Sequence, residues 1–264
     1  MNGIEHIKKA FERKDSLKIM THVVGGYPDV QTCEQLVLLM AEKGVDLVEI
    51  QLPFSDPTAD GAAIVQANHQ ALKNGISTHD VLNMTERIRK KITVPLLLMS
   101  YINPLLAYGP EKIVQRAIDI GLDGFIVPDL PPEEKDPPLS ELCRRAELAF
   151  VPLIAPTTPP RRMRLLTADN PSPFVYAVLR LGVTGAKTVL SKATAAYLNT
   201  TKRITGKYIA AGFGIAEPSQ LQALQGSADC AVIGSALLRI IRSALANKRD
   251  VLAAARIFLE HLSG

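Results

Sequence analysis

Short apolar runs alternate with longer amphipathic segments along most of the chain. The apolar runs are Ile19–Val24, Leu47–Ile50, Leu96–Met99, Phe125–Val127, Phe150–Leu153, Val175–Leu179, Tyr208–Ala211 and Cys230–Ile233. They lack the clean polar–apolar alternation of a strand with one solvent-exposed face, as expected for parallel strands that are buried on both faces. The pattern therefore predicts eight parallel strands.

The segments between these runs have the character of helices. Ile4, Ile7 and Phe11 have helical spacing, which predicts a short amphipathic helix at the start. Further helices are predicted over Val30–Lys43, Glu111–Ile120, Glu133–Glu147, Pro218–Leu224 and Arg249–Leu262. In AEKGVDLVEI, DIGLDGFIVP and LQGSADCAVIG, a glycine follows a helix, an aspartate comes soon after, and an apolar strand begins. Glycine ends a helix cheaply in the left-handed conformation, so the pattern indicates repeated helix–strand units.

Eight such units in 264 residues favour a closed barrel over an open sheet. The proline-rich patches are only of turn length, so none of them predicts a linker between domains. We therefore expect an α/β fold, a single (β/α)8 TIM barrel over residues 1–264 with a short N-terminal helix. In such a barrel the active site lies at the carboxyl ends of the strands.

Composition and charge narrow the classes of function. The net charge is +4, but lysines and arginines are spread along the chain, so nucleic-acid binding is not favoured and an anionic small molecule explains the excess equally well. The three cysteines include no C-x-x-C pair, which argues against a disulfide framework or a zinc site and fits a reducing compartment. The chain opens without an apolar signal region and has no membrane-length apolar stretch, so we expect a cytoplasmic protein.

Three carboxylates lie at and after the second predicted strand. Glu49 is near the end of an apolar strand, and Asp56 and Asp60 follow in a loop stiffened by Pro53 and Pro57. A carboxyl group with reduced solvation can take or give a proton near neutral pH. The alternative is that Glu49 pairs with a basic group and the aspartates only cap turns. Metal binding is disfavoured, because no histidine cluster accompanies the acids.

Glycine-rich loops follow three late strands in succession. They are the segments 181–187, 212–215 and 234–237, and a helix is predicted to start at Ser235. Exposed backbone N–H groups and a helix N-terminus favour an anion, and barrels often hold phosphate with these late loops. The segment from Arg180 to Ser191 is longer than a minimal loop and could be a lid. Taken singly, each glycine could serve only a turn.

Other barrel chemistries fit the sequence less well. A Schiff-base aldolase needs a lysine inside the barrel, but Lys18 and Lys207 are at strand starts. A zinc aldolase needs clustered histidines. Only His22, near the end of the first strand, could face the site, and it is as readily a core residue. The remaining histidines are expected in solvated helices or loops: His6, His69, His79 and His261. Carboxylates alone are therefore expected to carry the chemistry.

The chain resembles the α subunit of tryptophan synthase along essentially its whole length. The motifs that carry the resemblance are, in order, HVVGGYPD, VEIQLPFSDPTADG, SYINPLLAYG, VPDLPPEE, APTTPPRRM, LRLGVTGA, AAGFGIAEP and IGSAL. The resemblance implies retro-aldol cleavage of indole-3-glycerol phosphate to indole and glyceraldehyde 3-phosphate, in tryptophan biosynthesis. It implies no cofactor and no metal in this subunit.

The resemblance also assigns roles to residues of this sequence. Glu49 matches the catalytic acid/base, and Asp60 matches the carboxylate that holds the indole N–H and steadies positive charge on the ring. Positions that match the substrate, phosphate and lid contacts are Tyr176, Thr184, Gly185, Gly214, Gly234 and Ser235. Pro53 and Asp56 match the interface with a β subunit, which is expected to carry pyridoxal phosphate in an α2β2 assembly.

The chain departs from the common family pattern at several positions. Gln51 and Ala62 replace residues that are commonly glycine and proline, and His22 replaces an aromatic residue near the indole ring. Leu179 and Leu181 flank Arg180 at the root of the expected lid, where smaller residues are common. Because of Leu179 and Leu181, an alternative function stays open: an α subunit with little cleavage activity that mainly activates its β partner. A different phosphosugar isomerase or aldolase is disfavoured, because it gives no reason for the PFSDPTADG motif.

Overall fold

The parallel strands of the chain form one continuous sheet. The computed structural model describes residues 1–13, 16–179, 191–212 and 214–263. Within these ranges the strands are β1 (Lys18–Val24), β2 (Leu47–Gln51), β3 (Leu96–Met99), β4 (Gly124–Ile126), β5 (Ala149–Phe150), β6 (Leu153–Ile154), β7 (Phe174–Val178), β8 (Tyr208–Gly212) and β9 (Cys230–Ile233). Their order in the sheet is β5-β4-β3-β2-β1-β9-β8-β7-β6.

The sheet closes into a barrel through the segment that was predicted as the fifth strand. That prediction, Phe150–Leu153, was wrong in detail, because the structure has two short strands, β5 and β6, on either side of Val151 and Pro152. Proline has no N–H to donate to a neighbouring strand. The Val151 N–H still donates to Phe125 on β4, while the Pro152 carbonyl accepts from Tyr176 on β7. The short segment from β5 to β6 thus pairs with β4 on one side and with β7 on the other, which closes the barrel.

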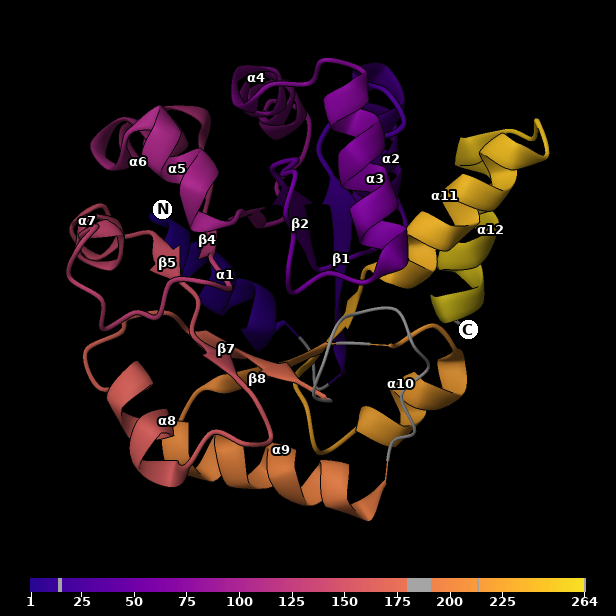
Figure 1. Cartoon of the computed structure of the whole chain (residues 1–264). Helices are drawn as coiled ribbons and strands as arrows, with labels where there is room; N and C mark the ends of the chain where they lie inside the picture. Colours follow the sequence, from indigo (N-terminus) through magenta and orange to yellow (C-terminus); the bar gives the residue numbers. More distant parts are fainter. Residues whose placement is uncertain (14–15, 180–190, 213, 264) are drawn as a thin grey trace.

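Helices surround the strands, most of them on the outside of the barrel (Figure 1). In the described ranges they are α1 (Gly3–Glu12), α2 (Val30–Glu42), α3 (Ala62–Lys73), α4 (Thr78–Arg89), α5 (Ile102–Tyr108), α6 (Pro110–Ile120), α7 (Leu139–Arg145), α8 (Pro160–Thr167), α9 (Lys192–Thr205), α10 (Pro218–Leu224), α11 (Ser235–Ala246) and α12 (Val251–Ser263). The predicted helix over Glu133–Glu147 was wrong in its first half. Pro137 and Pro138 disfavour helix before them, so α7 begins only at Leu139.

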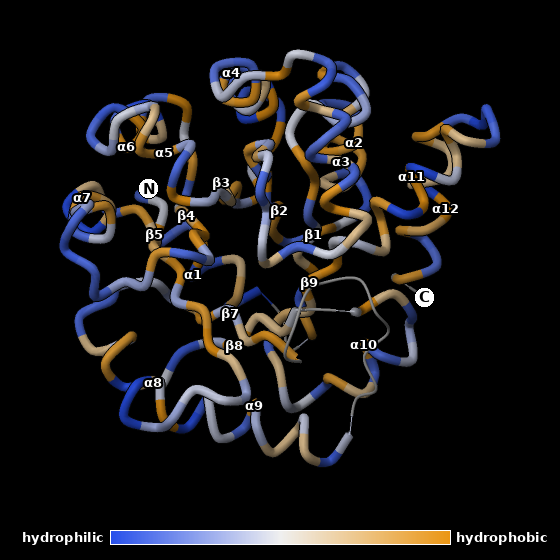
Figure 2. Tube along the Cα trace, viewed as in Figure 1, coloured by the Kyte–Doolittle hydropathy of each residue, from blue (hydrophilic) through white to orange (hydrophobic). Residues whose placement is uncertain are grey.

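Alternate residues of each strand face two different apolar layers. On β2, Leu47 packs in the barrel interior, whereas Val48 and Ile50 pack outward against the helices. On β7, Phe174 and Tyr176 point inward. Apolar residues gather along the strands and the helix surfaces that face them (Figure 2). Burial on both faces explains why the strand sequences show no polar alternation.

The recurring glycine–aspartate pattern fixes the register between neighbouring strands. Asp46 accepts a hydrogen bond from the Ile19 N–H at 2.9 Å, and Asp123 accepts one from the Leu96 N–H at 2.8 Å. Asp229 does the same for the next pair, accepting from Ile209 at 2.8 Å. Each aspartate thus ties the start of its strand to the start of the strand beside it. The predicted repeat of helix–strand units therefore has a common structural role.

Helix α1 packs against the amino-terminal ends of the strands. Its Ile7 and Phe11 are buried in the interior layer. The Phe11 ring stacks on Tyr208 at 4.8 Å between centroids and contacts Phe174 at 5.4 Å. Apolar packing therefore fills this end of the barrel, which leaves the carboxyl ends of the strands for a site.

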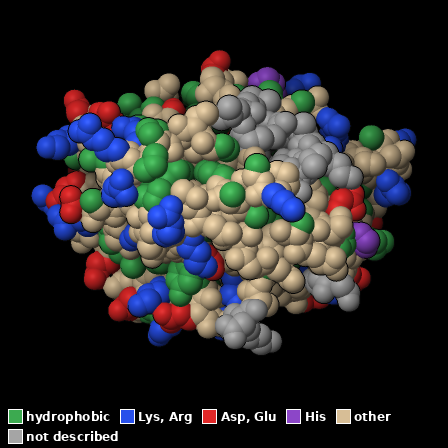
Figure 3. Space-filling model, turned by 90° about the horizontal axis from the view of Figure 1, so that it is seen from below, with side chains coloured by type: hydrophobic (Ala, Val, Ile, Leu, Met, Phe, Trp, Pro, Cys, Tyr) green, Lys and Arg blue, Asp and Glu red, His purple; other side chains and the backbone are tan. Residues whose placement is uncertain are grey.

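The outer surface carries charges of both signs together with some exposed apolar side chains, such as those of Leu165 and Ile257. On the face shown in Figure 3, acidic and basic side chains are interspersed. Among the residues that the structure describes, no helix is long and apolar enough to cross a membrane.

Candidate active site

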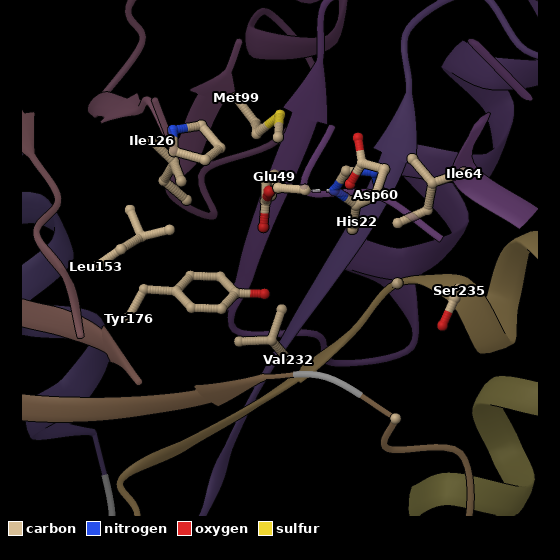
Figure 4. Close-up of a pocket in the computed structure, with 14 residues that line it drawn as sticks. His22, Glu49, Asp60, Ile64, Met99, Ile126, Leu153, Tyr176, Val232 and Ser235 are labelled. Carbon is tan, nitrogen blue, oxygen red and sulfur yellow. Dashed lines mark ion pairs between the residues drawn. The ribbon is translucent and has the colours of Figure 1, made fainter. Parts of the chain in front are cut away.

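A pocket opens at the carboxyl ends of the strands, where a barrel enzyme has its active site (Figure 4). It encloses about 580 Å³ of space, including its open mouth. Its lining residues come from nearly every strand or the loop that follows it: His22, Glu49, Ala59, Asp60, Ile64, Met99, Ile126, Pro128, Leu153, Tyr176, Gly214, Val232, Gly234 and Ser235. Most of this lining is apolar, so the few polar groups lie in surroundings of low polarity.

Glu49 projects from β2 into the barrel, and its partner is a histidine on the adjacent strand. The pairing of β1 with β2 places His22 directly opposite Glu49. His22 Nδ1 lies 3.1 Å from Glu49 Oε1, and both side chains are only 5% exposed. The other oxygen of the carboxylate, Oε2, is buried without a hydrogen-bond partner among the described residues, as is His22 Nε2.

Asp60 reaches the pocket from the loop between β2 and α3, and two neutral side chains hold it. Gln51 Nε2 donates to Asp60 Oδ2 at 2.8 Å, and the Tyr101 hydroxyl donates to the same oxygen at 3.1 Å. The Tyr101 hydroxyl also accepts from the Ala59 N–H at 2.9 Å. One tyrosine therefore fixes both the loop backbone and the carboxylate.

The rest of this loop is anchored to the body of the barrel. The Leu52 N–H donates to the Met99 carbonyl at 2.8 Å, and the Phe54 N–H donates to the side chain of Asn68 on α3 at 2.9 Å. The Phe54 ring also contacts the Tyr101 ring, with 5.4 Å between centroids. The position of Asp60 is thus determined before any ligand binds.

Burial and charge shift the pKa values of the polar groups in the pocket. Burial lowers the pKa of His22, but the negative charges of Glu49 and Asp60 outweigh it, and the net pKa is raised. Burial raises the pKa of Asp60, and the nearby His22 charge and the bonds from Gln51 and Tyr101 offset this only in part. Burial, followed by the two carboxylates, raises the pKa of Tyr176 well above its usual value, so this phenol stays neutral.

The side of the pocket at the carboxyl ends of β8 and β9 is built from glycines and a helix start. Gly212 leaves room for the Tyr176 ring, since a Cβ there would lie 2.5 Å from the phenol oxygen. A Cβ at Gly234 would approach His22 Cβ to 3.2 Å. Helix α11 begins at Ser235, immediately after Gly234, so its first N–H groups and the positive end of its dipole border the pocket. This side therefore suits an anion such as phosphate.

The structure brings together six of the predicted site residues. Glu49, Asp60, Tyr176, Gly214, Gly234 and Ser235 all line the one pocket. Pro53 and Asp56 do not line it; Pro53 is half-buried and Asp56 is exposed on the same loop. Thr184 and Gly185 lie outside the described residues, as do Leu181 and nearly all of the lid predicted from Arg180 to Ser191.

Some residues of the site escaped prediction. Tyr101 lies in the SYINPLLAYG motif but was not predicted as a site residue, because its contact with Asp60 joins residues that are 41 positions apart in the sequence. Gln220 holds the loop after β8 by donating to the Gly214 carbonyl at 2.9 Å and accepting from Ala216 at 2.9 Å. The sequence does contain a signal for Gln220, because it is a polar residue on the otherwise apolar buried face of α10.

His6 lies on a helix as expected, but it is less solvated than the sequence predicted. Its Nδ1 lies 2.7 Å from Asp123, across 117 residues of sequence, and its side chain is 21% exposed. The bond ties α1 to the base of β4. Within the described ranges, no group of three or more His, Cys, Asp or Glu residues could hold a metal ion.

A closed parallel barrel with two buried carboxylates facing a helix N-terminus has the architecture of a (β/α)8-barrel enzyme. The model of the family "Tryptophan synthase alpha chain" matches residues 8–263. The alpha chain of Syntrophotalea carbinolica is 39% identical over 235 residues, which is 89% of this chain and 92% of the relative. This chain belongs to the tryptophan synthase alpha chain family.

Solved structures agree with this assignment. Tryptophan synthase subunit alpha from Legionella pneumophila strain Paris has a TM-score of 0.89 at 30% identity, covering 99% of this chain and 97% of that one. A chain of the tryptophan synthase complex from Pyrococcus furiosus has a TM-score of 0.83 at 28% identity, covering 94% and 98%. The family is a lyase family that cleaves indole-3-glycerol phosphate in tryptophan biosynthesis, and this cleavage uses no cofactor. The predicted barrel, family and reaction are thus confirmed.

Proposed function

We propose that Glu49 performs the proton transfers of the cleavage. The reaction moves one proton from a glycerol hydroxyl to the ring carbon of indole, and the bond between the two parts breaks. Glu49 gives its proton to the ring carbon and takes the hydroxyl proton, so the carboxyl group ends as it began. The proposal rests on Glu49 Oε2, a buried carboxylate oxygen without a hydrogen-bond partner among the described residues, at the wall of the pocket.

Asp60 is proposed to steady the positive charge that the ring acquires when its carbon is protonated. Once ionised, it is a fixed negative group in a pocket of low polarity, where such a charge acts most strongly. Gln51 and Tyr101 both bond to Oδ2, which holds the carboxylate in place without neutralising it. Asp60 accepts the indole N–H in this arrangement.

The glycine side is proposed to bind the phosphate of the substrate. Gly234, Ser235 and Gly214 border the pocket at the carboxyl ends of β8 and β9. The N-terminus of α11 supplies backbone donors and a positive dipole end. Tyr176, between the two sides, contacts the indole or glycerol part. Thr184 and Gly185 are proposed to complete the phosphate and lid contacts.

We further propose that the chain works with a β subunit that carries pyridoxal phosphate, in an α2β2 assembly. The relative from Pyrococcus furiosus was solved as a tryptophan synthase complex. Pro53 and Asp56 lie on the surface side of the loop that carries Asp60, so a partner bound there would reach the catalytic loop directly. We also propose that residues 1–264 form one domain and that the protein is cytoplasmic.

The test is steady-state indole release from indole-3-glycerol phosphate, with and without a β subunit. We expect activity in the wild type and a loss of about 10²–10⁴-fold in kcat for Glu49→Gln. Glu111→Gln, an exposed position on α6, is the matched control and should keep wild-type turnover.

Two outcomes would contradict parts of the proposal. Wild-type turnover in Glu49→Gln would remove Glu49 from its role. If no indole is released even with β present, while β activity rises, the chain acts mainly as an activator of its partner.

A further inference from the structure

We propose that His22 is a positioning residue for Glu49: it holds Oε1 of the carboxyl group, shares the proton of the pair, and leaves Oε2 to exchange protons with substrate. The inference deepens the proposed function, because it rests on the role of Glu49 in proton transfer. It concerns His22, whose role the sequence alone did not decide: the side chain could face the site or belong to the core.

The first support is geometric. His22 and Glu49 are directly opposite each other on β1 and β2, so the backbone pairing itself aligns the two side chains. Nδ1 lies 3.1 Å from Oε1, and both side chains are almost fully buried. Because strand pairing fixes both residues, the carboxylate has little freedom to turn. Oε2 is left buried and without a partner among the described residues, and its side chain lines the pocket (Figure 4).

The second support is the persistence of one contact through the proton transfers. The Nδ1–H of His22 donates to Glu49 Oε1 in two protonation states of the pair. In one state the second proton is on Nε2 of the imidazole, and in the other it is on Oε2 of the carboxyl group. Glu49 can therefore be protonated on Oε2, give that proton to the ring carbon and take the hydroxyl proton, while the Nδ1–H bond to Oε1 stays in place. No proton is created or lost, and His22 keeps its Nδ1 proton throughout.

The third support is the charge around His22. The titratable groups that face it are Glu49 from β2 and Asp60 from the loop before α3, with Tyr176 on β7 across the pocket. On its other side β9 leads into Gly234, which brings no charge. The two carboxylates together raise the pKa of His22 against the effect of burial. His22 therefore keeps its added proton to a higher pH than a free histidine would.

The direct test is an NMR titration of the His22 imidazole in the full chain, assigned with His22→Asn. We expect a midpoint above the ordinary value of about 6.5 in the wild type. In Glu49→Gln the midpoint should fall, because the effect of burial is then opposed only by Asp60 and by the hydrogen bond with Gln51. A His22 midpoint that does not move in Glu49→Gln would overturn the inference.

The kinetic test separates position from charge. The side-chain amide introduced by His22→Asn can still donate to Oε1, whereas His22→Phe keeps a ring without a donor. We expect kcat to fall about tenfold or more in His22→Phe and to be largely restored in His22→Asn. In His22→Asn the alkaline limb of the pH–rate profile should also change, because the introduced amide does not titrate whereas His22, with its raised pKa, does.

His261→Asn, at an exposed position on α12, is the matched control and should leave rate and profile unchanged. Equal kcat values for His22→Phe and wild type would refute the positioning role. The two proposals fail separately. If Glu49→Gln retains turnover, the proposed function fails, whereas a loss of turnover without any change at His22 removes only the inference.

Discussion

The two sides of the pocket are built in different ways. On the side of β1, β2 and the loop before α3, the polar groups are side chains, and each is held by other side chains, as Asp60 is by Gln51 and Tyr101. On the side of β8 and β9, the polar groups are mostly backbone N–H groups, exposed by glycines and by the start of α11. The first side suits proton transfer and the second suits the binding of an anion.

This difference implies that substitutions on the two sides should change different kinetic constants. A carboxylate that acts on the reacting atoms affects mainly kcat. A donor to a phosphate that stays intact affects substrate and transition state alike, and so mainly KM. The following substitutions test that division.

Asp60→Asn should give the largest effect of the set. The amide can still accept the indole N–H, but it carries no charge to steady the protonated ring, so we expect kcat to fall about 10²–10³-fold. Asp60 has a raised pKa, so wild-type turnover should also decline as the pH falls through that value, and the variant should lack this decline. Rates are measured by indole release over a range of pH.

Asp56→Asn is the control for that experiment, because Asp56 is exposed on the same loop. A comparable loss in both variants would show that the loop tolerates no change, and would remove the evidence for a charge effect at Asp60.

Ser235→Ala should raise KM about tenfold or more and leave kcat nearly unchanged. The hydroxyl at the start of α11 is expected to donate to the substrate phosphate, and a hydrogen bond to a charged group contributes about 1.5–3 kcal/mol. Ser243→Ala, exposed on the same helix, should change neither constant. An unchanged KM in Ser235→Ala would place the phosphate elsewhere.

Tyr101→Phe should reduce the free energy of unfolding by about 1–2 kcal/mol, because one hydroxyl bonds both Asp60 and the Ala59 N–H. Urea unfolding measures the change. Tyr108→Phe is the matched variant, since Tyr108 is half-buried and contacts the His79 ring rather than the loop. Equal stability of the two variants would mean that Tyr101 does not anchor the loop.

Asp56→Asn should have the smallest effect, and only in the presence of a partner. We expect the turnover of the isolated chain to be unchanged and its stimulation by a β subunit to fall a few-fold, since an exposed charge at an interface contributes modestly. Titration of cleavage activity with the β subunit measures this. A full response to β would remove Asp56 from the proposed interface.

The sequence predicts those parts of the molecule that depend on local pattern. Strands buried on both faces, the helix start at Ser235 and the position of Glu49 within a strand all follow from residues close in sequence. The glycine loops are visible for the same reason, because backbone exposure needs only glycine at the right place.

Contacts between distant segments are what the sequence does not show. The pairing of His22 with Glu49 depends on the register of two strands that are separated in the chain by α2. The contact of Tyr101 with Asp60 depends on where a loop folds, and that of His6 with Asp123 depends on how α1 packs under the barrel. The break between β5 and β6 at Pro152 is a smaller difference from the prediction. Proline lacks an N–H, so it interrupts strand pairing on one edge only.

The most direct test of the division between the two sides is to measure kcat and substrate Kd on Glu49→Gln and Ser235→Ala together. We expect Glu49→Gln to bind indole-3-glycerol phosphate nearly as well as the wild type while its turnover is lost. We expect Ser235→Ala to bind more weakly and, at saturation, to turn over normally. If both variants lose affinity and turnover in the same proportion, the two sides of the pocket do not have separate roles.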